Sequence, residues 1–141
     1  MPNKKIQGNL YFAFRLLIGI FFLSHGAQKL FGVFGGVDGN GGAVNLFSMF
    51  GLAGLIEFIG GLFIFLGLFT SIVSLVAALE MLTAYFMVHV PSGGILPLMQ
   101  QANGEPAILF FAAFLVLIAF GAGKWSLEKK ILGKEIWHRK K

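Results

Sequence analysis

The stretch FIGGLFIFLGLFTSIVSLVAAL, residues 58–79, decides how this chain folds, because it carries no charged side chain and is interrupted at Gly67–Ser71. Glycine, threonine and serine at that point are typical of a turn. A membrane-spanning helix needs about 20 mostly apolar residues. We therefore predict two such helices, over residues 47–69 and 71–90. The connection between them is so short that they must lie side by side and antiparallel.

The composition of the whole chain indicates the same environment. Of its 141 residues, 57% are hydrophobic and 12% are charged, whereas about a quarter of the residues in a soluble domain are charged. Seventeen phenylalanines exceed what a soluble core of this size can hold. Two further apolar segments, about residues 10–31 and 106–123, complete the prediction. The expected fold is all-α: an integral-membrane four-helix bundle that forms one domain over residues 1–141.

The basic residues predict how the bundle is oriented. Lys4, Lys5 and Arg15 lie near the start, and seven more Lys or Arg lie in the segment 124–141. The glycine-rich loop 32–45 and the loop 91–105 contain none. Cytoplasmic loops are the ones enriched in Lys and Arg. We therefore expect a multi-pass protein of a bacterial-type inner membrane with both termini in the cytoplasm.

The same placement explains the net charge of +5 without nucleic acid, since the basic residues cluster beside apolar segments. In the tail, residues 124–141, apolar side chains alternate with basic ones. This pattern predicts a basic amphipathic tail at the cytoplasmic surface of the lipid bilayer, broken near Gly133. A solvated tail that only fixes the orientation is the alternative.

Ionisable side chains that interrupt the apolar helices are the candidate site residues, because charge inside a bilayer is costly. At about 100° per residue, Arg15, His25 and Lys29 share one face of the first helix. Glu57 lies near the middle of the second helix between two small residues, which favours an inward face. Glu80 lies near the middle of the third helix, at a depth similar to that of Glu57.

These residue types suggest a role for each position. Glu57, Glu80 and His25 are the candidate catalytic residues: the glutamates as proton-handling groups, and His25 as a hydrogen-bond donor to a carbonyl oxygen or a proton relay. The candidate substrate-binding residues are Arg15, which would balance the buried charge, and three residues expected at the outward mouth: Lys29, His89 and Glu105. A locked polar network is the alternative for the two glutamates, and an ion pair with Glu57 or Glu80 is the alternative for Arg15.

Several kinds of site are not favoured. The chain has no cysteine, which excludes disulfides, thiolate metal ligands and dithiol chemistry within it. His25 and His89 differ in expected depth, so a haem held between them is not favoured. No histidine follows either glutamate at the spacing of a dimetal site. We therefore predict no metal and leave the cofactor unidentified, with a quinone as the candidate.

The chain resembles the DoxX family of small four-helix membrane proteins. In the first helix the resemblance rests on Arg15, Gly19, His25-Gly26, Lys29-Leu30 and Gly32, and in the second on Glu57 with Gly60-Gly61. Further along it rests on Asn103-Gly104-Glu105 and on Gly121-x-Gly123-x-Trp125-Ser126-Leu127. Glu128 stands where the family usually has an aspartate. The resemblance implies an inner-membrane bundle; members are commonly labelled oxidoreductases, and the family name comes from a subunit of a quinone-linked sulfur oxidation system.

Three functions stay open at this point. The first is a component of a membrane redox system that binds a quinone or a redox partner protein. The chain shows no electron carrier of its own, so whether it is itself an enzyme is left undecided. The second is a non-enzymatic accessory, anchor or assembly subunit for a partner enzyme. The third is a transporter for protons or small solutes, for which a homo-oligomer could supply the path.

Overall fold

The computed structural model of the chain describes residues 3–93 and 104–137, and all of its regular elements there are helical. Three helices are long and apolar enough to cross a membrane: α1 (Lys4–Phe31), α2 (Met49–Leu66) and the continuous helical stretch Thr70–Ser92 that begins with α3 (Thr70–Ala84). A shorter apolar helix, α5 (Glu105–Phe120), and the short helix α6 (Leu127–Leu132) follow.

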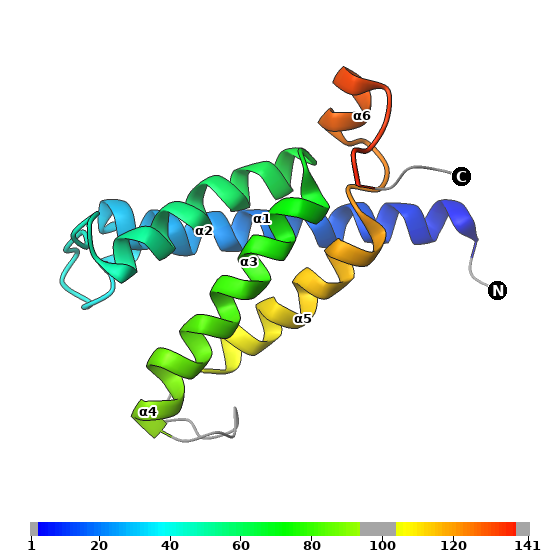
Figure 1. Cartoon of the computed structure of the whole chain (residues 1–141). Helices are drawn as coiled ribbons and strands as arrows, with labels where there is room; N and C mark the ends of the chain where they lie inside the picture. The colour runs from blue at the N-terminus through cyan, green and yellow to red at the C-terminus, as the bar shows by residue number, and fades with distance from the viewer. Residues whose placement is uncertain (1–2, 94–103, 138–141) are drawn as a thin grey trace.

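The helices associate as two pairs that cross (Figure 1). α1 lies along α2, and α3 lies along α5. The tail with α6 folds back to the end of the molecule where α2 turns into α3. The core between the two pairs is apolar, with the Phe22 and Phe114 rings 4.8 Å apart, and neither side chain is exposed. The crossing therefore gives the molecule two ends, which we name the tail end and the loop end, the latter after the loop 32–48.

Glycines allow the close approach of α1 and α2. A methyl group on Gly26 would collide with the backbone of Phe58, and one on Gly61 would collide with the backbone of Leu23. Small residues bring helix backbones together in this way in membranes, where helix association depends on packing. The face of α2 that carries Glu57 is thus turned inward, as the spacing of its glycines predicts, and Glu57 is only 2% exposed.

The tight turn lies where the sequence places it, between Gly67 and Phe69. Gly67 ends α2 in the left-handed conformation, with φ of 70°, and its N–H donates to the Ile64 carbonyl. Ser48 begins α2 by accepting a hydrogen bond from the Gly51 N–H. α2 is therefore shorter at both ends than the predicted range of 47–69.

Other boundaries differ more. α1 begins at Lys4, well before the predicted residue 10, because the Asn3 side chain caps it by accepting a 2.9 Å hydrogen bond from the Lys5 N–H. The third helix does not end at residue 90: a π-helical turn, Tyr85–His89, leads into α4 (Val90–Gly93). In that turn the Val90 N–H donates to the carbonyl of Tyr85. This wider register carries the helix through Pro91, which has no N–H to donate.

The fourth apolar segment begins at Glu105, followed by Pro106 in the first turn. It ends at Phe120 rather than at 123, because Gly121 adopts a positive φ of 67° there. Residues 94–103 of the predicted loop 91–105 and residues 138–141 of the predicted tail lie outside the described residues. Within the tail, α6 ends at Gly133, the position at which the pattern predicted a break.

Candidate functional site

Lys29 of α1 and Glu57 of α2 form an ion pair inside the bundle, and Glu80 of α3 is near enough to be affected by both charges; we name these three residues the glutamate cluster. The Lys29 ammonium lies 2.5 Å from Glu57 Oε1. The side chain of Lys29 is 19% exposed and that of Glu57 is 3% exposed. The carboxylate is therefore buried and the ammonium side chain is partly exposed, and α1 and α2 each supply one charge to the pair.

Glu80 joins this pair from α3. It is half-buried, and the charges of Glu57 and Lys29 are near enough to act on its carboxyl group. Within the described part of the chain, Glu80 Oε2 and Glu57 Oε2 are both buried without a hydrogen-bond partner. Buried polar atoms in folded proteins nearly always have a partner. The cluster thus offers two acceptor oxygens and has one cation for two carboxyl groups.

His25 lies at the rim of this region. The buried residues of α1 form a stripe of Arg15, Gly19, Phe22 and Gly26, and His25 is displaced from it. Its imidazole stands edge-on to the Phe110 ring, with the centroids 5.6 Å apart, and the residue is exposed. The contact with Phe110 places the imidazole against α5, and its predicted role stays a prediction.

Two of the three residues predicted at the mouth lie close together: His89 at the end of the π-helical turn that follows α3, and Glu105 at the start of α5. A methyl group on Gly104 would come within 3.1 Å of His89 Cβ, so the end of the π-helical turn packs against the start of α5. Glu105 follows directly and is exposed. The two residues are therefore neighbours at one end of the α3–α5 pair, while Lys29 belongs to the α1–α2 pair.

Arg15 is placed differently from the expectation. It is fully buried, and its guanidinium donates to the backbone carbonyls of Ile64 at 2.6 Å and Phe65 at 2.7 Å, at the end of α2. A third hydrogen bond, of 3.3 Å, reaches the carbonyl of Trp125. Among the described residues it forms no ion pair with Glu57 or Glu80, so that suggested pairing is wrong. The last carbonyls of a helix lack partners within the helix, and Arg15 supplies donors to them.

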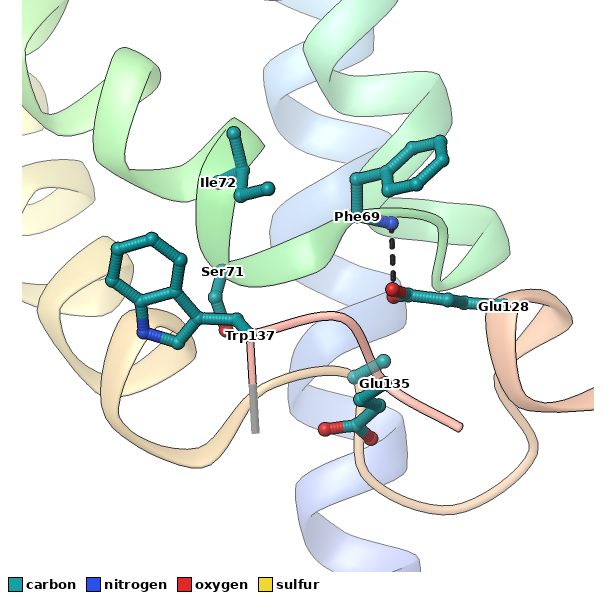
Figure 2. Close-up of a pocket in the computed structure, with 7 residues that line it drawn as sticks. Phe69, Ser71, Ile72, Glu128, Glu135 and Trp137 are labelled. Carbon is teal, nitrogen blue, oxygen red and sulfur yellow. Dashed lines mark hydrogen bonds between the residues drawn. The ribbon is translucent and has the colours of Figure 1, made fainter. Parts of the chain in front are cut away.

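Arg15 is part of a second polar group, which we name the tail network. Its other main member is Glu128, which is 3% exposed. One carboxylate oxygen accepts from the Phe69 N–H at 3.1 Å and the other from the Ile136 N–H at 2.8 Å. Figure 2 shows the Glu128 carboxylate against the Phe69 nitrogen, with Glu135 and Trp137 of the tail around the same small cavity. That cavity measures about 10 Å³, room for about one water molecule.

The tail network ties the tail to three helices. The Tyr11 hydroxyl donates to the Gly121 carbonyl, and the Glu128 N–H donates to the Gly67 carbonyl at 3.2 Å. Neither Tyr11 nor Glu128 was predicted from the sequence to be a buried anchor. A turn at this place could have been predicted from the run Gly121–Glu128, because its glycines and serine are typical of turns.

Comparison with known proteins identifies the family of the chain. The model of the DoxX family matches residues 10–90. The chain belongs to the DoxX family. This DoxX protein is also 34% identical over 135 residues to an uncharacterized protein of Haemophilus influenzae, covering 95% of the chain and all of that relative. No solved structure matches it. All of the glutamate cluster lies inside the matched region, whereas Glu128 lies beyond it.

Proposed function

We propose that this DoxX protein is a component of a membrane redox system that binds a quinone or a redox partner at the glutamate cluster. The observation that supports this best is the pair of buried oxygens without partners, Glu57 Oε2 and Glu80 Oε2. An ion pair that served only to hold α1 against α2 would be complete with Lys29 and Glu57. Glu80 adds a second carboxyl group to the same place and has no ion-pair partner there among the described residues.

The cluster has the groups that two-electron chemistry on a quinone requires of a protein. Reduction of a quinone takes up two protons, and oxidation of a quinol releases them. Glu80 would carry one of these protons, because one cation is shared between two carboxyl groups. Lys29 and Glu57 would hold the charge balance as it does so. His25, at the rim, would donate to a carbonyl oxygen of the bound group.

The topology that we propose with this function has four crossings, with α5 as the fourth. α5 has only 16 residues, about 24 Å of helix. It runs alongside α3, which belongs to a spanning stretch (Figure 1). Both chain ends, with the basic tail, then lie in the cytoplasm of an inner membrane, and the glutamate cluster lies in the outer half of a single membrane domain.

The accessory-subunit function is the second candidate, and the tail network favours it. Arg15 and Glu128 are buried charges whose hydrogen bonds all serve to join helix ends and tail. A protein can therefore bury charge here for architecture alone, and the Lys29–Glu57 pair fits that role as well.

The experiment that separates the two starts from protein purified from native membranes in mild detergent. Quinone per protein is measured by extraction of the lipids, and proteins that co-purify are identified. Glu80→Gln is the informative variant, because it removes the ionisable group without breaking the Lys29–Glu57 pair. Ser74→Ala is the matched control, since the Ser74 hydroxyl is also buried on α3 without a partner but lies outside the cluster.

Quinone in the wild type and in Ser74→Ala, together with its loss from Glu80→Gln, is the result expected of the redox component. If no preparation contains quinone and one partner protein accompanies all three, the glutamate cluster has a structural role and the protein is an accessory subunit.

A further inference from the structure

Hydrogen bonds hold the backbone of the loop 32–48, between α1 and α2, in a defined conformation. The Gln28 side chain donates to the Gly36 carbonyl at 2.9 Å, and the Val44 N–H donates to the Lys29 carbonyl at 2.9 Å. Across the loop, the Gly41 N–H donates to the Gly35 carbonyl at 2.7 Å. The loop is thus fastened to the last turns of α1 at two points, and its outward side chains are held in place.

Two of those outward side chains are large aromatic rings. Phe34 is 78% exposed and Phe47 is 99% exposed. Neither ring packs against another aromatic ring in the described chain, whereas Phe31 and Phe58, next to them in the fold, pair at 5.3 Å. The structure therefore directs these two rings away from the protein.

The backbone of Phe34 is strained in doing so. Its φ of 55° lies in the left-handed region, which is an outlier for a bulky residue. Two other non-glycine residues share a positive φ, Phe69 and Trp125, and both serve the tail network through their backbone atoms. Strain that the surrounding structure maintains commonly marks a functional position.

We propose that the loop 32–48 is a membrane anchor, and that Phe34 and Phe47 insert into the boundary between headgroups and acyl chains in the bilayer leaflet at the loop end. The occupant is lipid for two reasons. The apolar surface continues along the chain into the ends of the spanning helices, where Phe31 is 60% exposed and Met49 is 62% exposed. Loop residues 32–48 also include no Lys or Arg, and phenylalanine is among the residues that interfacial segments bury at the boundary between headgroups and acyl chains.

This anchor would affect the glutamate cluster through one backbone hydrogen bond. The Val44 N–H binds the carbonyl of Lys29 itself, so the position of the loop in the membrane helps to fix the helical turn that carries the ammonium. The anchor does not depend on whether the cluster binds a quinone, and its test uses lipid alone.

The test places a single tryptophan in the loop. The parent is the full chain with Trp125→Phe and Trp137→Phe, which leaves no other tryptophan. Phe34→Trp and Phe47→Trp are each reconstituted into phosphatidylcholine vesicles, with or without bromine on the acyl chains close to the headgroups. Asn40→Trp is the matched control, because Asn40 is exposed on the same loop within its polar Asp-Gly-Asn-Gly run.

We expect the emission of Phe34→Trp and Phe47→Trp to be shifted to the blue and to lose most of its intensity in brominated vesicles. Asn40→Trp should emit as in water and keep its intensity. Circular dichroism confirms that each variant is folded. If the two loop tryptophans emit like Asn40→Trp in both kinds of vesicle, the proposal is wrong. It is also wrong if they are shifted to the blue without quenching, in proportion to protein density, since a second copy of the chain then covers the rings.

Discussion

Arg15, which is fully buried, and Lys29, which is partly exposed, are two cations on one helix, and their surroundings differ in a way that separates architecture from function. They lie 14 residues apart on α1, about 21 Å of helix. Arg15 binds three backbone carbonyls, which any sequence would supply at that helix end and turn. Lys29 binds a carboxylate whose second oxygen has no partner among the described residues, with a further carboxyl group near it. The first arrangement joins helix ends to the tail, although Arg15 Nε is itself buried without a partner among the described residues. The second leaves two carboxyl oxygens as acceptors for a ligand.

The substitution expected to change the free energy of unfolding most is Arg15→Leu. It removes two short hydrogen bonds from a charged donor and leaves the carbonyls of Ile64 and Phe65 buried. Since a hydrogen bond to a charged group contributes about 1.5–3 kcal/mol, we expect a loss of about 3–6 kcal/mol in the free energy of unfolding. Arg15→Lys, which keeps the charge, should lose clearly less. Denaturant titration in detergent measures both; equal losses would contradict the assignment of Arg15 to the end of α2.

The next largest effect concerns the ion pair. Lys29→Met leaves the Glu57 carboxylate buried without its cation, which costs about 3–5 kcal/mol for a fully buried pair. Because Lys29 is partly exposed, we expect about 2–3 kcal/mol. Adding Glu57→Gln to Lys29→Met should restore most of that stability, since the double variant buries no charge. Quinone content should not recover in the double variant. A double variant that is as unstable as Lys29→Met would show that the pair is not the source of the loss.

A smaller loss of stability is expected at the contact between α1 and α2, which lies between the glutamate cluster and the tail network. Gly61→Ala should cost about 1–3 kcal/mol, because the added methyl group meets the backbone of Leu23 and overpacks the contact. Gly60→Ala is its neighbour and control. There the nearest atom, Val73 Cγ1, is 3.4 Å away, an ordinary contact. Stability should hardly change at Gly60. A similar loss at both positions would contradict the close approach of the two backbones.

The smallest effect is expected at Asp38, outside both polar groups. A hydrogen bond from the Asn40 N–H lowers the pKa of the Asp38 carboxyl, which is exposed. A lowered pKa means that its contribution is fully present above the ordinary value of about 4 and is lost as the pH falls through the lowered value. Asp38→Asn should therefore melt slightly below the wild type at neutral pH and converge with it in acid. A gap that widens in acid would reverse the sign.

Some of this arrangement could be predicted from the sequence. The inward face of Glu57 follows from its glycines, because helical periodicity fixes which residues share a face. The tight turn after Gly67 follows from the short connection. His25 was predicted on the same face as Arg15, but it lies about 80° from Arg15 around the helix, and this offset leaves it exposed at the rim.

The tail network could not be predicted in the same way. Arg15 and Glu128 bind backbone N–H and carbonyl groups, and every residue carries these, so no sequence pattern marks the partner. Helix ends were also misjudged where a local device decided them: the Asn3 cap extended α1 to Lys4, and the π-helical turn Tyr85–His89 carried the third helix through Pro91.

The sequence by itself determined that this is a helical membrane protein of the DoxX family, which face of α2 turns inward, and which residues would bring charge into the bundle. Apolar length and helical periodicity are local properties. In a bilayer, a long apolar segment with helical periodicity predicts a spanning helix. Only the tertiary structure decided that Lys29 pairs with Glu57 while Arg15 serves the tail. That choice depends on the offset between antiparallel helices and on where their ends meet, and packing between distant segments sets both.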